Sequence, residues 1–170
     1  MIKISPKKIP GKWREGYALD YHTLRSDFIG HDEYGHPMFD TERSEIGELL
    51  YRLKYKSDKS VVDSIVEAAA DFITSWGQNL NLMLPTPPSR LKRAYQPVLE
   101  IAKGLSLHLN IALCSNCIVK VKNTPELKNV YDYNQRAKLL EDAYDINTSK
   151  VSGQNVLLTD VTQTRFRVLT

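Results

Sequence analysis

Three segments of the chain carry hydrophobic residues at the three- and four-residue spacing of an amphipathic helix. The first runs from residue 44 to about residue 55. The second runs from about residue 60 to residue 76, where Gly77 is a suitable C-terminal stop. The third spans about 96 to 109. Candidate N-terminal caps for the first helix are Asp40, Thr41 and Ser44.

Short apolar runs between these segments are typical of buried strands. Leu80–Leu84 is closed abruptly by prolines, Ile111–Cys114 and Ile118–Val121 flank a Ser-Asn turn, and Asn155–Leu158 follows a Ser-Gly pair. This alternation of strands and helices predicts an α/β core with a parallel sheet in residues 44–170. Alternating pieces and turn residues predict a small β-rich lead-in over residues 1–43.

Composition narrows the class of protein without selecting a function. The 170 residues suit one globular domain, and a net charge of +3 admits anionic small molecules or nucleic acid equally. The two cysteines, Cys114 and Cys117, supply neither a disulfide framework nor a four-cysteine zinc site, so we predict thiols buried in the core. No signal-peptide or membrane-spanning pattern is visible, which together with the cysteine usage predicts a cytoplasmic protein without membrane contact.

The first candidate site follows the strand at 80–84. Pro87, Pro88, Ser89 and Arg90 place stiffened backbone, a hydroxyl and a guanidinium beyond the carboxyl end of a strand, where open α/β sheets bind ligands. Such a loop suits a phosphate or pyrophosphate. A solvated proline turn remains the alternative.

The second candidate site is a lysine-bearing segment after the strand at 118–121. Lys120, Lys122, Thr124 and Lys128 lie in a polar stretch long enough to close over a ligand and to neutralise a departing pyrophosphate. An ordinary solvated surface loop is the alternative.

The third candidate site follows the strand at 155–158. Asp160 can hold sugar hydroxyls, while Thr159, Thr162 and Thr164, with nearby backbone amides, can hold a phosphate. Strands also end in Thr-Asp for reasons of turn geometry alone, so this alternative stays open.

These three segments, in this order, resemble the type I phosphoribosyltransferase superfamily, and in particular its ComF-like branch. The resemblance covers most of the chain. Residues 47–55 (GELLYRLKY) resemble the helix before the family's core, residues 85–90 (PTPPSR) its pyrophosphate loop, and residues 122–128 with Arg136 its flexible loop.

The resemblance implies transfer of ribose 5-phosphate from phosphoribosyl pyrophosphate, with Mg²⁺ held on the pyrophosphate. In that case Arg90, Lys122 and Lys128 would neutralise pyrophosphate, and Asp160 would hold the ribose hydroxyls in an oxocarbenium-like transition state.

Two departures from the family pattern predict impaired catalysis. Thr159 stands in place of the first of two acids, and Arg165, Phe166 and Arg167 occupy a turn where small residues would let the backbone wrap a phosphate. The chain stops at Thr170, before the helix and strand expected next, which predicts an incomplete core with one uncovered sheet edge. A frameshift, a truncation and an adaptation to binding all fit this pattern.

The leading hypothesis is therefore a protein that binds phosphoribosyl pyrophosphate or a nucleotide phosphate, with reduced or absent turnover. The alternative is an accessory protein, for DNA uptake or mobile-element defence, that binds single-stranded nucleic acid or a protein partner covering the open sheet edge. A non-functional remnant is the third possibility.

Overall fold

The computed structural model describes residues 2–88, 95–124, 130, 132–161 and 165–169. Its centre is a six-stranded mixed sheet with the strand order β1-β2-β10-β9-β5-β6. The β9–β5 and β5–β6 pairs are parallel, whereas the pairs that join β1, β2, β10 and β9 are antiparallel. These strands are β1 (Lys7–Lys8), β2 (Glu15–Ala18), β5 (Leu82–Pro85), β6 (Ala112–Leu113), β9 (Val156–Asp160) and β10 (Arg165–Leu169).

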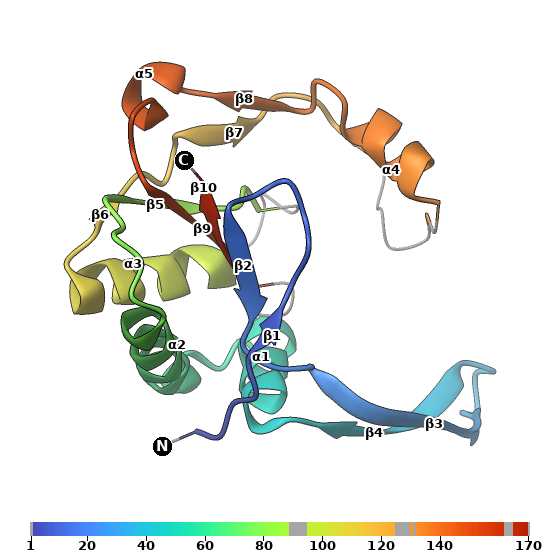
Figure 1. Ribbon diagram of the computed structural model, residues 1–170. Coiled ribbons are helices and arrows are strands. Elements are labelled where there is room, and N and C mark those ends of the chain that lie inside the picture. The colour runs from blue at the N-terminus through green and yellow to red at the C-terminus, as the bar shows by residue number, and fades with distance from the viewer. Residues whose placement is uncertain (1, 89–94, 125–129, 131, 162–164, 170) are drawn as a thin grey trace.

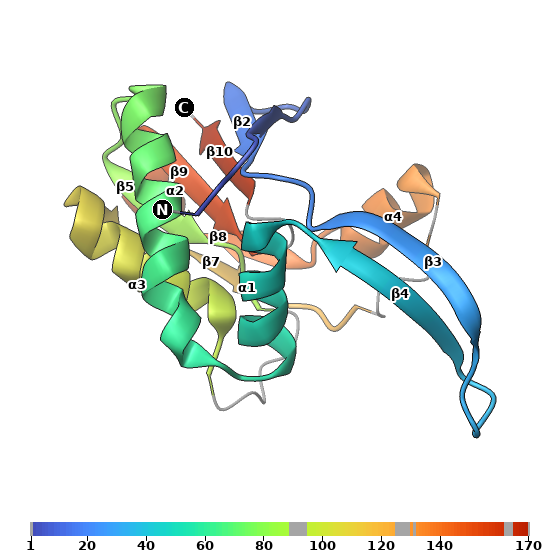
Figure 2. The same cartoon turned by 90° about the horizontal axis from the view of Figure 1, so that it is seen from below.

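Helices α1, α2 and α3 pack on one face of the sheet (Figures 1 and 2). Helix α1 (Glu45–Tyr55) begins after Ser44, whose hydroxyl accepts a hydrogen bond from the Gly47 N–H. The short 3₁₀ turn η1 (Lys59–Val61) leads into α2 (Val62–Trp76), which ends at Gly77 with φ of 69°. Helix α3 (Pro97–Leu109) connects β5 to β6. All three helices expected from hydrophobic spacing are confirmed.

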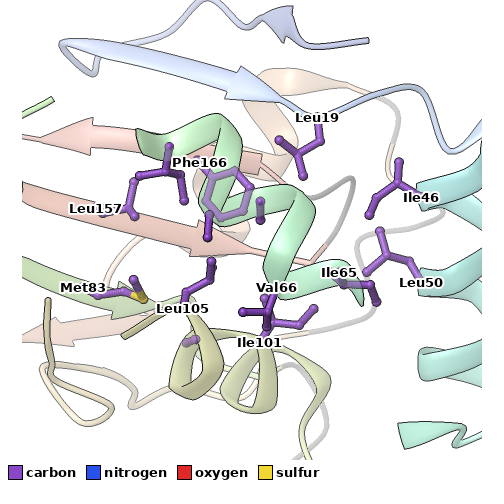
Figure 3. Packing of buried hydrophobic residues seen from close by; sticks show 14 of the residues in the cluster. Leu19, Ile46, Leu50, Ile65, Val66, Met83, Ile101, Leu105, Leu157 and Phe166 are labelled. Carbon is purple, nitrogen blue, oxygen red and sulfur yellow. The ribbon is translucent and has the colours of Figure 1, made fainter. Parts of the chain in front are cut away.

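The main hydrophobic core lies between these helices and the sheet. Figure 3 shows the side chains of the central strands meeting those of the helices. Alternate residues of each strand face this core because successive side chains of a strand point to opposite faces. The labelled strand residues are Met83, Leu157 and Phe166, and the helical residues facing them include Ile65, Val66, Ile101 and Leu105.

A smaller apolar cluster lies on the other face of the sheet. Leu84 and Val156, the strand neighbours of Met83 and Leu157, are buried there with Cys117. Three short elements that follow Cys117 in the chain lie on that side: the antiparallel strands β7 (Ile118–Lys120) and β8 (Tyr144–Ile146), and the single turn α5 (Thr148–Val151). Figure 1 shows these elements on the opposite side of β5 from α3.

The β-rich lead-in is confirmed as strands, but its two parts behave differently. Strands β1 and β2 join the central sheet, because β2 pairs with β10 from Arg165↔Ala18 to Val168↔Glu15. Strands β3 (Thr23–His31) and β4 (Pro37–Arg43) instead form a separate antiparallel hairpin. Figure 2 shows this hairpin extending away from the body of the molecule.

The structure corrects four expectations, most of which concern the C-terminal half. The sheet is mixed, not wholly parallel. The residues expected in a phosphate-binding turn, Arg165, Phe166 and Arg167, lie in strand β10. The sheet edge beyond β9 is therefore covered, since β10 pairs with β9 on one side and with β2 on the other. Within the polar stretch expected as a loop, residues Tyr133–Leu140 form helix α4.

Candidate functional site

The candidate site is the rim of the sheet at the carboxyl ends of β5 and β9. These strands are parallel and neighbouring, with Pro85 paired to Thr159. The Thr86 N–H donates a hydrogen bond of 2.9 Å to the Thr159 carbonyl, so the register continues one residue past β5. The proline-rich segment and Asp160 therefore leave the sheet side by side. The residues that directly follow β5 and β9 therefore lie at one edge of the sheet.

Individual side chains at this rim differ in what they can offer a ligand. Pro87, Pro88 and Asp160 are half-buried and border solvent. Thr159 is buried, with 2% of its surface exposed, and its hydroxyl points to the Leu84 carbonyl oxygen at 3.5 Å. The Thr159 side chain therefore faces the protein interior, and we expect Asp160 to be the first side chain of this segment within reach of a ligand.

His22 is a neighbour of the rim that no sequence motif marks. Its pKa is lowered from the ordinary value near 6.5 to about 4, mainly because burial disfavours the charged imidazolium. The positive charges of Lys54 and Arg165 lower this pKa further, while the carboxylates of Asp160 and Asp20 oppose them. Its Nε2 atom is buried and has no hydrogen-bond partner among the described residues. At neutral pH, His22 is therefore an uncharged ring near two cations and two carboxylates.

The backbone of His22 lies in close contact with helix α1, and this contact fixes the position of His22. A Cβ atom built on Gly47 would lie 2.3 Å from the His22 carbonyl oxygen, so only glycine fits at this point of the helix. The close contact between the His22 backbone and Gly47 could not be predicted from the sequence, because a glycine inside a helical pattern has several explanations. Lys54 belongs to the predicted helix, but nothing in the sequence predicts that it lies near His22.

The lysine-bearing segment begins in β7 and leads towards α4. Lys120 ends β7, and the Lys122 ammonium donates a hydrogen bond of 3.4 Å to the Glu141 carbonyl. Thr124 is half-buried, and Arg136 of α4 donates to the Val130 carbonyl. Among the described residues, no hydrogen bond or ion pair joins Lys120, Lys122 or Thr124 to the rim. The expected meeting of these lysines with Asp160 stays a prediction.

Five of the expected site residues fall outside the described ranges. They are Ser89, Arg90, Lys128, Thr162 and Thr164.

The described residues offer little to hold a metal ion directly. No group of three or more His, Cys, Asp or Glu side chains gathers in the described ranges. The Mg²⁺ ion that the resemblance implies therefore stays a prediction.

The expectation of two core thiols is wrong in one respect. Cys117 is buried, as expected, with 1% of its surface exposed. However, the sulfur atoms of Cys114 and Cys117 are bonded to each other as a disulfide across the turn between β6 and β7. Only two residues, Ser115 and Asn116, separate the bonded cysteines in the sequence.

Comparisons with known proteins identify no family for this chain, so its class is defined by its fold alone. No protein-family model matches the chain, and no curated protein matches it. The chain is an α/β protein with a mixed six-stranded sheet and a polar rim at the carboxyl ends of its parallel strands. In the described part of the chain, no helix is both long and apolar enough to cross a membrane.

Proposed function

We propose that this protein binds phosphoribosyl pyrophosphate or a nucleotide phosphate at the rim of β5 and β9, without efficient turnover. The observation that carries the proposal is the parallel pairing of β5 with β9, which brings the proline-rich segment beside Asp160. Ligands of open α/β sheets bind outside the carboxyl ends of such strands. The type I phosphoribosyltransferase-like core that the sequence resembles uses the same edge.

The charges around Asp160 support an anionic ligand that also carries hydroxyl groups. Arg165 is the strand partner of Asp160, and the positive charges of Lys54 and Arg165 act on the same His22 ring as the Asp160 carboxylate. A phosphate group would interact favourably with these cations, while the Asp160 carboxylate accepts hydrogen bonds from sugar hydroxyls. A ribose phosphate combines both features, whereas inorganic phosphate has only one of them.

Binding without efficient turnover is the better proposal because β9 leads into another strand. Strand β10 returns antiparallel to β9, and its Phe166 is buried in the core. Where a turn leads into a helix, by contrast, free backbone N–H groups and the helix dipole stabilise a phosphate. Since β10 uses its backbone groups to pair with β9 and β2, residues 165–169 cannot supply such a row of free amides.

Calorimetric titration of the full chain with phosphoribosyl pyrophosphate and Mg²⁺ tests this proposal. We expect saturable binding that Asp160→Asn weakens at least about tenfold, since a neutral amide is a poorer partner for ribose hydroxyls. The matched control is Asp71→Asn, which makes the same change on the exposed surface of α2 and should leave binding unchanged. Absence of heat at millimolar ligand with a folded sample would refute the proposal.

A second candidate function, binding of a protein partner, is favoured by the β3–β4 hairpin. Phe28 and Phe39 pair across its two strands and are each more than half exposed. Exposed aromatic side chains on a projecting element are typical of protein interfaces. Between Thr23 and Arg43 the hairpin carries five acidic side chains and two arginines, and this negative charge disfavours nucleic acid.

Binding to single-stranded DNA separates these alternatives. If the protein acts on nucleic acid, its affinity for single-stranded DNA should fall steeply with salt and should not respond to phosphoribosyl pyrophosphate. If the hairpin binds a protein, no such affinity is expected, and Phe28→Ser with Phe39→Ser should leave calorimetric binding of phosphoribosyl pyrophosphate unchanged. Salt-sensitive DNA binding by the unmodified chain would count against the protein-partner alternative.

A further inference from the structure

The Cys114–Cys117 disulfide connects two parts of the fold. Cys114 directly follows β6, an edge strand of the central sheet, and its N–H donates a hydrogen bond of 3.0 Å to the Met83 carbonyl of β5. Cys117 directly precedes β7, and its carbonyl accepts a 2.9 Å hydrogen bond from the Asn147 N–H, just beyond β8. The bond therefore lies where the β7–β8 pair attaches to the central sheet.

The two sulfur-bearing residues differ in exposure. Cys117 is buried beside Leu84 and Val156 in the smaller apolar cluster. Cys114 is only partly buried, and Ser115 and Asn116, the two residues of the turn between the cysteines, are exposed. A reductant can therefore approach the disulfide from the Cys114 side, whereas the Cys117 side is closed by apolar packing.

We expect the disulfide to restrict the unfolded chain only slightly. A disulfide that closes a long loop restricts the unfolded chain most, and this one closes a loop of only four residues. A reduced Cys117 would also remain compatible with its surroundings, because a protonated thiol behaves as a small apolar group. Both the bonded and the reduced states are thus accessible to the folded protein.

We propose that Cys114 and Cys117 form a reversible thiol–disulfide site that is reduced by a dithiol and that controls how firmly the β7–β8 pair is attached to the central sheet. The site is independent of the phosphate-binding function proposed above. Its substrate class is a dithiol reductant, and its oxidant class is a small disulfide such as glutathione disulfide.

The exchange proceeds in two steps. A thiolate of the reductant attacks the Cys114 sulfur, the bond to Cys117 breaks, and the Cys117 thiolate leaves and takes up a proton. The second thiolate of the reductant then attacks the reductant's own sulfur in this mixed disulfide. Cys114 leaves as a thiolate and is protonated, so the protein gains two electrons and two protons, and the reductant becomes a disulfide. Glutathione disulfide reverses the change through a mixed disulfide on Cys114.

Thiol counting on the unmodified full chain tests the site, since these are its only two cysteines. After purification without reductant, alkylation in denaturant followed by mass spectrometry should find no free thiol. After incubation of the folded protein with dithiothreitol it should find two, and glutathione disulfide should return the count to zero. A count of two that glutathione disulfide does not change would overturn the proposal, as would a disulfide that dithiothreitol reduces only in denaturant.

Single variants test the predicted direction of attack. The variant Cys117→Ser keeps only the Cys114 thiol, and Cys114→Ser keeps only the Cys117 thiol. In the folded proteins, the Cys114 thiol should react with an aromatic disulfide reagent at least about tenfold faster than the Cys117 thiol. Circular dichroism provides the control that both variants are folded. Equal rates in two folded variants would contradict the assignment of Cys114 as the attacked sulfur.

Hydrogen exchange tests the structural consequence. Reduction of the unmodified chain should speed amide exchange in β7 and β8 severalfold, while amides of β5 and β9 serve as the internal control. If β7 and β8 exchange at the same rate in both redox states, the site does not control their attachment, and that part of the proposal is wrong.

Discussion

Two antiparallel hairpins of similar local design differ in what surrounds them. The β9–β10 hairpin lies inside the central sheet, and its alternate side chains, including Phe166, face the core formed with α1, α2 and α3. The β3–β4 hairpin has longer strands, yet most of its side chains are exposed. Both are paired by backbone hydrogen bonds, but only the first buries a hydrophobic face. Backbone pairing alone is therefore a poor guide to which hairpin stabilises the protein.

The β3–β4 hairpin has its own cross-strand contacts in place of a core. The Phe28 and Phe39 rings meet edge to face, with centroids 5.8 Å apart, and the Ser26 and Thr41 hydroxyls are 3.0 Å apart. Arg25 forms an exposed ion pair with Asp27 at 2.9 Å. Such exposed pairs each contribute little, on the order of 1 kcal/mol or less. We therefore expect this hairpin to open locally before the body of the protein unfolds.

The largest predicted effect contrasts one phenylalanine from each hairpin. Phe166→Ala should lower the free energy of unfolding by about 3–5 kcal/mol, because Phe166 is 1% exposed and its removal leaves a cavity in the core. Phe39→Ala, the matched change in the β3–β4 hairpin, should lower it by less than about 1 kcal/mol, since Phe39 is 53% exposed. Urea unfolding of both variants measures the difference, and similar losses would refute the contrast.

Hydrophobic spacing predicted the body of the fold well, but not the role of β10. The helices and the strands at β5 and β9 follow patterns that are strong within a single segment. Arg165 to Leu169 also alternates in the manner of a strand, with Phe166 and Val168 buried between half-buried neighbours. The family resemblance suggested a turn there, and this expectation outweighed a correct local signal. The pairing of β10 with β2 could not be predicted, because it joins residues at opposite ends of the chain.

The candidate site was predictable where it depends on strand order and not where it depends on packing. Parallel strands bring their carboxyl ends to one edge, so the proximity of the proline-rich segment and Asp160 followed from the predicted topology. His22 has no sequence motif, and its place near Asp160 depends on the close approach of its backbone to Gly47. The burial of the Thr159 side chain likewise depends on the face of β9 that it occupies.

The second prediction concerns the point where the β3–β4 hairpin joins the body. Gly47→Ala should destabilise the protein by about 2 kcal/mol, because the added Cβ would collide with the His22 carbonyl, a backbone atom that cannot rotate away. The displacement of His22, which immediately precedes β3, should also make the hairpin more sensitive to limited proteolysis. The control Asp71→Ala adds alanine at an exposed position of α2 and should cause no loss of stability. An unchanged unfolding midpoint for Gly47→Ala would show that this junction is not tightly packed.

The smallest predicted effect is a pH dependence at the same junction, where His22 lies near Asp160, the last residue of β9, and Arg165, the first residue of β10. The folded-state pKa of His22, about 4, is below the unfolded value near 6.5, so between these values the unfolded chain binds a proton that the folded protein does not. The contribution of His22 to the free energy of unfolding is therefore fully present above pH 6.5, and it declines as the pH falls towards 4. Because solvent reaches part of the ring, we expect a loss of roughly 1 kcal/mol.

Urea unfolding measured between pH 7 and pH 4.5 tests this prediction. The variant His22→Gln should lose this pH-dependent part of the stability, whereas His108→Gln, a control at an exposed position of α3, should retain it. Identical pH profiles for the two variants would show that His22 takes up a proton in the folded state. The junction between the β3–β4 hairpin and the body would then be open to solvent.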